Sequence, residues 1–155
     1  MKTLSAWQAK IEQVKGLLGI KSEQAEVWLE NAEIVPGSSK DTEDGLHYLD
    51  FEYRAVLYIE RLPQEVGGLL ILLAHQFVNG LGERDGLEAP TMSIIALDSG
   101  RYVDVELTFG VRDPVHIVPV ENSPIVINGQ PMGFAPGAWN IATEFGIEAG
   151  RRAED

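Results

Sequence analysis

The chain has 155 residues, of which 45% are hydrophobic and none is cysteine. This composition fits one domain with a substantial core, and it excludes a disulfide framework and a thiolate metal site. The net charge of -12 repels nucleic-acid phosphates and disfavours a nucleic-acid-binding protein. The apolar run from Leu69 to Ala74 is far shorter than the ~20 residues of a membrane span. Because the first residues also lack the apolar core of a signal peptide, we expect a soluble protein that is not exported.

Apolar residues at helical spacing open the chain: Leu4, Trp7, Ile11, Val14 and Leu18. Their spacing predicts an amphipathic helix that ends at Gly19. Residues 1–21 also hold four lysines against Glu12, so a basic segment precedes an acidic body. This segment is either a solvated helix face or a surface that pairs with another copy of the chain.

The next stretch contains two short β-prone runs, Val27–Leu29 and Ile34–Val35, on either side of four polar residues. Two such runs around a polar connection predict a hairpin. From Gly37 to Gly45 the sequence has no apolar residue. We interpret this strip as a mobile polar loop that orders only on a partner.

Residues Leu46 to Glu60 alternate between an apolar face and a face of charged and aromatic residues, which predicts one long strand. Pro63-Gln64-Glu65, with a proline and an acidic residue in the first turn, opens a second helix, which ends at Asn79–Gly80. Two consecutive glycines, Gly67 and Gly68, weaken this helix. A close approach of another backbone would explain them.

Two further alternating runs, Met92–Leu97 and Arg101–Val111, are joined by Asp-Ser-Gly and predict a hairpin. The order of elements predicts an α+β fold, with a mainly antiparallel sheet of about four to five strands and two helices packed on one face. We expect this domain to cover residues 1–118.

From Arg112 onward the chain is rich in proline and glycine. We expect residues 119–155 to form a C-terminal extension or arm that packs on a partner. A small hairpin should pair Ile125–Ile127 with Met132–Phe134 around Asn128-Gly129, and Trp139 to Phe145 should form a last turn or short helix.

The sequence carries no recognisable catalytic or metal-binding motif. Three histidines are scattered along it: His47, His75 and His116. No pair of them has the spacing of a zinc site. Two pairs of carboxylates share strand faces: Asp50 with Glu52, and Asp104 with Glu106. Such positions favour charge for solubility rather than acid–base catalysis, so we predict a protein that is not an enzyme and that uses no cofactor and no metal.

Tyrosine and arginine side chains gather on the polar side of the predicted strands, which is typical of the energetically important residues of protein interfaces. Together with the basic first helix they predict a subunit or partner interface of eight residues: Trp7, Lys10, Tyr48, Arg54, Tyr58, Arg61, Tyr102 and Arg112. The alternative is a second helix layer that covers this face within the subunit. For Trp7, the alternative is packing on the chain's own sheet.

Residues from about Ala25 to Val118 resemble the phage tail completion protein R family of contractile-tailed temperate phages. The resemblance is carried by Val27–Val35, by Leu49–Ala55 with the FEYR core at Phe51–Arg54, by the apolar helix Leu69–Phe77, and by Val103–Leu107 with Val111. The order and spacing of these segments carry more weight than any single motif. In the family the first hairpin often turns on Asn-Gly, where this chain has Asn31-Ala32, and the segment beyond about Pro119 has no counterpart.

The resemblance implies an α+β structural subunit that joins the finished tail tube, caps its growth and presents a surface for head joining. By analogy with tail terminators, the assembly would be a ring of six copies. Its partners would be further copies of itself, the tail-tube protein and head–tail connector proteins. DNA would at most pass through the ring, and no membrane would be involved. The location would be the head-proximal end of the virion tail and, during assembly, the host cytoplasm.

Two other functions stay open at this point. One is a tail-tube or neck adaptor subunit of a phage or a phage-derived tailocin, which differs because a tube subunit stacks without limit. The other is a small-molecule-binding domain or enzyme with an acidic site, which a deep pocket holding Asp50, Glu52 or His75 would favour.

Overall fold

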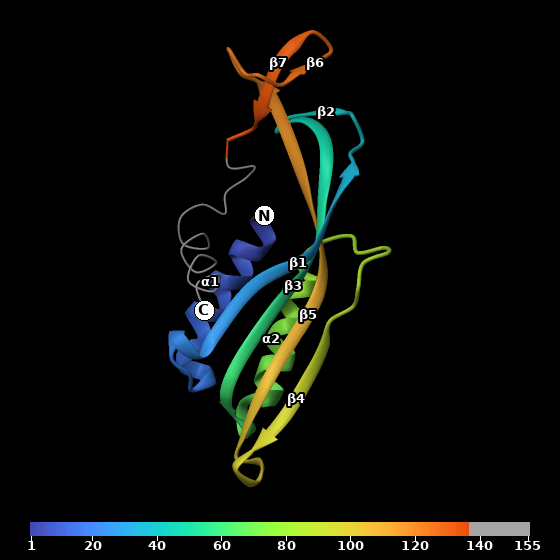
Figure 1. Cartoon of the computed structure of the whole chain (residues 1–155). Helices are drawn as coiled ribbons and strands as arrows, with labels where there is room; N and C mark the ends of the chain where they lie inside the picture. The colour runs from blue at the N-terminus through green and yellow to red at the C-terminus, as the bar shows by residue number, and fades with distance from the viewer. Residues whose placement is uncertain (137–155) are drawn as a thin grey trace. The chain divides into compact units, whose positions relative to one another are not determined.

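The structure is a computed structural model and describes residues 1–136. The turn or helix expected at Trp139 to Phe145 lies outside the described residues. The fold is α+β, as predicted, with two α-helices and a curled antiparallel sheet (Figure 1). The helices are α1 (Lys2–Leu18) and α2 (Gly67–Asn79). The strands are β1 (Ala25–Pro36), β2 (Asp41–Thr42), β3 (Gly45–Pro63), β4 (Thr91–Leu97), β5 (Tyr102–Pro119), β6 (Val126–Ile127) and β7 (Gln130–Phe134).

Within residues 1–136 the sheet has seven strands, in the order β1-β3-β5-β7-β6, with β2 paired to β3 and β4 paired to β5. The chain divides into two compact units. The helical unit comprises Thr3–Asn31 and Tyr53–Val111, and the hairpin unit comprises Met1–Lys2, Ala32–Glu52 and, within the described residues, 112–136. Strands β1, β3 and β5 each contribute residues to both units.

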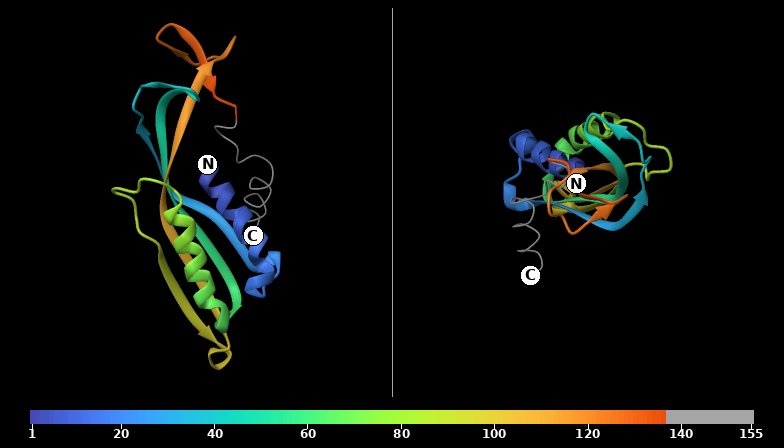
Figure 2. Two further views of the ribbon diagram at one scale, coloured as in Figure 1. Left: turned by 180° about the vertical axis from the view of Figure 1, so that it is seen from behind. Right: turned by 90° about the horizontal axis from the view of Figure 1, so that it is seen from above.

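The core of the helical unit forms between the two helices and the sheet. Both helices lie on the same face of the strands (Figure 2), and the whole apolar stripe of α1 is buried, as predicted. The ring of Trp7 lies 4.7 Å from that of Phe77 on α2 and 5.6 Å from that of Phe109 on β5, measured between centroids. Helix α1 ends at Leu18, and Gly19 then adopts a φ of 68°, which a glycine tolerates without steric cost.

The first predicted hairpin is wrong. Residues Ala25–Pro36 form one continuous strand, β1, and the chain does not reverse at the polar residues 30–33. Asn31 adopts a φ of 56°, which asparagine tolerates better than most residues. All residues from 31 to 34 are exposed to solvent, including the polar Asn31 and Glu33, so this stretch can continue a strand as well as it can form a turn.

The polar strip from Gly37 to Gly45 is also not the mobile loop that we expected. Backbone hydrogen bonds tie it to β3, from Gly37 N–H to the Tyr48 carbonyl at 3.0 Å and from Ser39 N–H to the His47 carbonyl at 2.9 Å. Strand β2 lies within the strip and pairs with the start of β3. The backbone satisfies its own polar groups here, so the strip orders without apolar side chains.

Strand β3 agrees with the predicted alternation, and helix α2 forms close to its predicted position. Side chains at alternate positions of β3, from Tyr53 to Ile59, are buried. Helix α2 ends at Asn79 as predicted, but Pro63 leads first into a 3-10 turn, Gln64–Val66. No atom lies within 4 Å of the position that a Cβ would take on Gly67 or Gly68. Within the described residues, therefore, no second backbone explains these two glycines.

The hairpin of β4 and β5 is confirmed, with Met92 opposite Leu107 and Ile94 opposite Val105. Strand β5 continues to Pro119, so the sheet extends beyond Arg112, where the proline-rich composition begins. The small hairpin is present as β6 and β7, but its register differs from the predicted one. Ile127 lies opposite Gln130 across a two-residue turn, whereas the residues from Met132 to Phe134 pair with β5. Both turn residues have positive φ, which matches the Asn-Gly sequence. The role of residues 119–155 as an arm stays a prediction.

Candidate functional site

The candidate site is the face of the sheet that the helices of the helical unit leave uncovered. In β5 the side chains at 103, 105, 107 and 109 are buried under the helices, so those at 102, 104, 106 and 108 belong to the opposite face. Four of the eight predicted interface residues come from this part of β3 and β5: Arg54, Tyr58, Arg61 and Tyr102. All four are partly or fully exposed.

One half of this face is a cluster around Arg61. Its guanidinium carbon lies 4.5 Å above the centre of the Tyr102 ring, and its Nη2 donates to Asp98 Oδ2 at 2.6 Å. The backbone N–H of Arg61 donates to Asp104 Oδ1 at 3.0 Å. Arg61 has a φ of 52°, and this irregularity of the strand is what brings an odd-numbered residue of β3 to Tyr102 and Asp104.

Tyr58 belongs to the same cluster. Partial burial raises the pKa of the Tyr58 phenol above its ordinary value, and the negative charges of Asp104, Glu60 and Glu106 act in the same direction. A hydrogen bond to Asp104 adds to this effect. The phenol therefore stays protonated and presents a fixed hydrogen-bond donor on a negatively charged strand face.

The other half of the face centres on Arg54. Its Nε donates to Glu88 Oε2 at 2.8 Å and its Nη1 to Glu30 Oε1 at 3.2 Å. These two hydrogen bonds, with that of Glu88 the stronger, raise the pKa of Arg54. Arg84 fixes the loop that carries Glu88, because it donates to the carbonyls of Gly110 and Glu88, each at 2.8 Å. The guanidinium of Arg54 is thus held between β1 and an anchored loop.

The chemistry of this face follows from these pairings. The guanidinium groups of Arg54 and Arg61 are already paired with carboxylates of the same subunit, and Glu60 and Glu106 add further negative charge. The face as a whole is therefore acidic. It offers aromatic rings, planar guanidinium groups and carboxylates to a partner, and the complementary partner surface would be basic.

The other four predicted residues do not join this face. Trp7 is completely buried, so its place in the interface is wrong, and packing on the chain's own sheet is correct for it. Lys10 lies half-buried on α1. Tyr48 and Arg112 belong to the hairpin unit, where Tyr48 is exposed and Arg112 Nε donates to Glu52 Oε2 at 2.7 Å.

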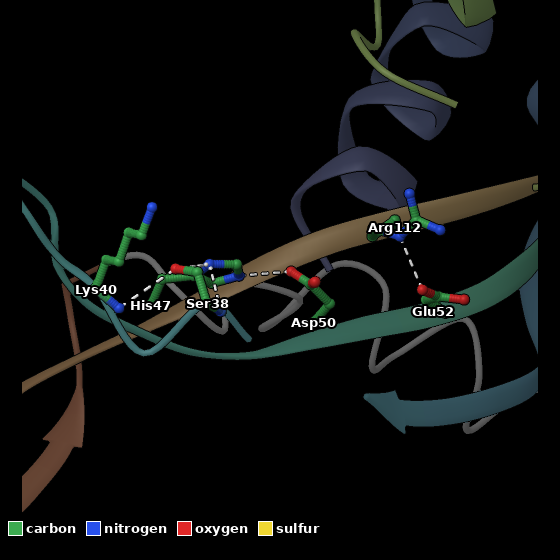
Figure 3. Close-up of polar contacts among 6 residues, drawn as sticks. All are labelled: Ser38, Lys40, His47, Asp50, Glu52 and Arg112. Carbon is green, nitrogen blue, oxygen red and sulfur yellow. Dashed lines mark hydrogen bonds and ion pairs between the residues drawn. The ribbon is translucent and has the colours of Figure 1, made fainter. Parts of the chain in front are cut away.

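A second polar cluster lies in the hairpin unit, around His47 (Figure 3). The Nε2 atom of His47 lies 2.7 Å from Asp50 Oδ1, and its Nδ1 lies 2.9 Å from Ser38 Oγ. The order Ser-His-Asp is that of a catalytic triad. However, the backbone N–H of Ser38 also donates to Nδ1 at 3.1 Å, and this bond occupies the lone pair that a general base needs. The cluster therefore fixes the polar strip onto β3 and does not support nucleophilic catalysis.

A groove of about 220 Å³ opens in the helical unit between α2 and β4. Its lining residues are mainly apolar: Ile71, Ala74, His75, Pro90, Thr91, Met92 and Leu107. Its polar side chains are His75, which lies 3.0 Å from the amide of Asn79, and Thr91. The lining includes His75, one of the three residues whose presence in a deep pocket would favour an enzyme or a small-molecule-binding domain, but it contains neither Asp50 nor Glu52 and no other carboxylate.

Two further searches of residues 1–136 bear on function. No three histidine, aspartate or glutamate side chains come together there as a metal site. No helix in that range is long and apolar enough to cross a membrane.

Sequence reasoning found the aromatic and basic members of the outer face but missed their acidic partners. Asp104 was interpreted as a charge for solubility, although its period-two position on the same face as Tyr102 was a usable signal. Glu30 and Glu88 gave no such signal, because β1 was predicted to turn at that point and Glu88 lies in a loop.

Taken together, the fold and this face define an α+β subunit with an acidic, aromatic- and arginine-bearing sheet surface. Comparisons of the chain with protein-family models, with curated proteins and with solved structures found no match. The function is therefore argued from the residues and the fold.

Proposed function

We propose that the chain is a structural protein that completes the tail of a contractile-tailed phage. In this proposal several copies, six by analogy with tail terminators, form a ring at the head-proximal end of the tail tube. The ring stops the growth of the tube and presents a surface for joining to the head. Its partners are further copies of the chain, the tail-tube protein and the head–tail connector proteins.

The observation that carries the proposal is the outer face of β3 and β5. The FEYR core that resembles the phage family lies on β3, at Phe51–Arg54, and its arginine belongs to this face. Tyrosine and arginine are the residues that dominate binding energy at protein interfaces. The ion pairs and the stacking on Tyr102 hold these side chains in place before binding, so less side-chain entropy is lost on association.

The distribution of charge supports association between copies. The outer face is acidic, whereas α1 carries Lys2, Lys10 and Lys15 against Glu12 alone. Complementary surfaces at different places on one molecule produce head-to-tail contacts, which close into a ring when the rotation between copies permits. A ring of acidic subunits would also repel DNA from its inner wall, which suits a conduit. A basic channel in an assembled ring would contradict that last point.

The native mass of the protein tests the proposal, measured by light scattering on a size-exclusion column. The wild type should form a discrete oligomer that high salt loosens, because screening weakens charge pairs between copies. Arg54→Glu and Tyr58→Ala should weaken the oligomer without unfolding the subunit. Arg101→Glu, an exposed arginine outside the two clusters, makes the same charge change as Arg54→Glu and should leave the mass unchanged. An unchanged oligomer in both test variants would remove this face from the interface.

A binding test addresses the tail itself. When tail-tube protein from the same phage polymerises, the chain should bind the tube end and stop its elongation, as electron microscopy would show. Lateral binding along the tube, or elongation at the same rate, would count against tail completion. Unlimited stacking of the chain on itself would favour the tube-subunit alternative.

A further inference from the structure

The first observation concerns an uncharged surface on the helical unit. Helix α2 contains no charged residue in its 13 positions, and it leaves three large apolar side chains exposed: Leu69 (36%), Ile71 (51%) and Leu72 (68%). Strand β4 lies across the groove and is also uncharged, with Ile94 55% exposed on the same side as the buried Val105. Charged residues make up 23% of the chain, so a surface without charged residues is unusual for this chain.

The second observation concerns the edge of β4. Within the described residues β4 pairs only with β5, so its other edge presents unpaired backbone N–H and C=O groups. Natural proteins block pairing at such an edge with charged residues, lysine above all, or with proline. Strand β4 has none of these, since its sequence is TMSIIAL. Together with the groove, this edge has the composition of a surface that is covered in an assembly.

The third observation is a matching projection on the hairpin unit. The segment from Pro124 to Phe134, which includes β6 and β7, contains no charged residue. Ile125 is 56% exposed and Val126 is 60% exposed. A tight Asn-Gly turn connects the two strands, which makes the tip narrow. Contact of these apolar side chains with water is unfavourable, and the described part of the hairpin unit does not cover them.

We propose that the β6–β7 hairpin of one copy docks into the groove between α2 and β4 of a second copy. The proposal rests on the proposed function, because it adds an apolar contact between neighbouring subunits of the ring to the charged contact between the outer face and α1. The apolar side chain of Val126 occupies the groove beside Ile71 and Met92. Strand β6 lies along the unpaired edge of β4.

A second copy fits this surface better than an unrelated partner does. Both surfaces belong to one chain, so a contact between copies covers the two at once and leaves neither exposed. Because both lack charged residues, docking buries no unpaired charge, and such depletion of charge is the compositional mark of an interface core. The contact joins different surfaces of two identical subunits, which is the head-to-tail geometry that closes into a ring.

The size of the contact sets its strength. Each surface exposes only a few large apolar side chains, so it falls in the range of about 300–600 Å² that the largest patches of monomers reach. A standard stable interface buries roughly 800 Å² per partner. Hairpin docking alone is therefore weak, and we expect a dissociation that dilution reveals. Closure of the ring adds the remaining stability.

Two single variants test the contact against one matched control. Ile71→Lys places a charge in the groove and Val126→Lys places one on the hairpin, and each should weaken self-association about tenfold or more. Ile34→Lys is the control for both variants, because Ile34 is exposed on β1 and lies outside the groove, the hairpin and α1. The control should associate like the wild type. All three positions are at least half exposed, so thermal unfolding should show that every variant folds.

Mixing the two test variants gives the decisive result. The Ile71→Lys protein keeps an intact hairpin and the Val126→Lys protein keeps an intact groove, so an equimolar mixture should form a one-to-one pair more tightly than either variant associates with itself. Sedimentation velocity measures this pair. A mixture that stays monomeric, or single variants that associate like the wild type, would overturn the docking. If the wild type forms a discrete oligomer that both variants retain, the docking fails and the ring stands. If the wild type stays monomeric at every concentration, both fail.

Discussion

The two units of this chain use the same three strands in different ways. In the helical unit, β1, β3 and β5 lie under two helices, and a continuous core forms from Trp7, Phe109 and the alternate side chains of β3. In the described residues of the hairpin unit, the only helical residue is Lys2, the first residue of α1. Its buried apolar side chains within the described residues are few: Met1, Val115, Ile117, Met132 and Ala135.

This difference shows how one strand can serve two purposes. Where helices cover the sheet, apolar burial provides the stability. In the hairpin unit, backbone ladders, tight turns and the contacts of His47 and Arg112 provide more of the order. A surface that binds a partner can be built on the hairpin unit, because the ends of its hairpins are not needed for the core. The predictions below test this division.

The largest effect is expected at Trp7. Trp7→Ala should lower the free energy of unfolding by about 3–5 kcal/mol, because it leaves a cavity against Phe77 and Phe109. Chemical denaturation of the purified variant measures this loss. Leu17→Ala, an exposed leucine on the same helix, should change stability by no more than about 0.5 kcal/mol. If the Trp7→Ala subunit is as stable as the wild type but does not assemble, Trp7 belongs to the interface after all.

The helices and the long strands could be predicted from the sequence because their signals are local. Burial under helices makes alternate residues of β3 apolar from Tyr53 to Ile59, although Val56 on the other face is also buried. The stripe of α1 repeats at helical spacing. The continuity of β1 could not be predicted in this way, because exposed polar residues at 31–33 are equally compatible with a turn and with a solvated strand. The order of the polar strip rests on backbone pairing, which side-chain patterns do not report.

The candidate site was only partly predictable. Alternation placed Tyr58 and Tyr102 on the polar side of their strands, and this was correct. The position of Arg61 depends on a positive φ that its residue type does not favour. The partner of Arg54 comes from a loop distant in sequence, at Glu88. Ion pairs of this kind depend on the tertiary fold and produce no periodic pattern in the sequence.

A second, smaller effect is expected in the hairpin unit. Gly45 has a φ of 116°, and a Cβ there would lie 2.6 Å from the Ile117 carbonyl oxygen. Gly45→Ala should therefore cost about 1–3 kcal/mol. Hydrogen exchange should show faster opening of β2 and the adjoining part of β5, with the amides of α1 and α2 unchanged. Gly82→Ala is the control, since Gly82 also has a positive φ but nothing within 4 Å. Equal acceleration in both units would mean that they unfold together.

A third change should stabilise the helical unit. Gly68 lies in α2 with open space around its Cβ position, so Gly68→Ala should raise the free energy of unfolding by about 0.5–1 kcal/mol. Urea denaturation at low protein concentration measures the subunit alone. Gly110→Ala provides the contrast, because its Cβ would lie 2.7 Å from the Glu88 backbone nitrogen, and it should destabilise. If Gly68→Ala instead lowers the free energy of unfolding, the space around the Cβ position of residue 68 is occupied.

The smallest effect concerns pH and a surface contact of α1. Hydrogen bonds from Lys15 and then Ser22 lower the pKa of Glu12 in the folded state. A lowered pKa means that the carboxylate stabilises the fold above its ordinary pKa and that this stability is lost as pH falls through the lowered value. Because Glu12 is exposed, the contribution should stay below about 0.5 kcal/mol. Comparing Glu12→Gln with the wild type by urea denaturation between neutral and acidic pH should show a difference that disappears in acid. A difference that persists in acid would show that the charge is not its origin.

The central claim is that the chain assembles into a closed ring, and its native mass over a range of protein concentrations tests that claim most directly. The account predicts that association rises with concentration and stops at one discrete particle, near six times the 17.0 kDa of a single chain. A strict monomer at the highest concentration, or a mass that grows without limit, would contradict it.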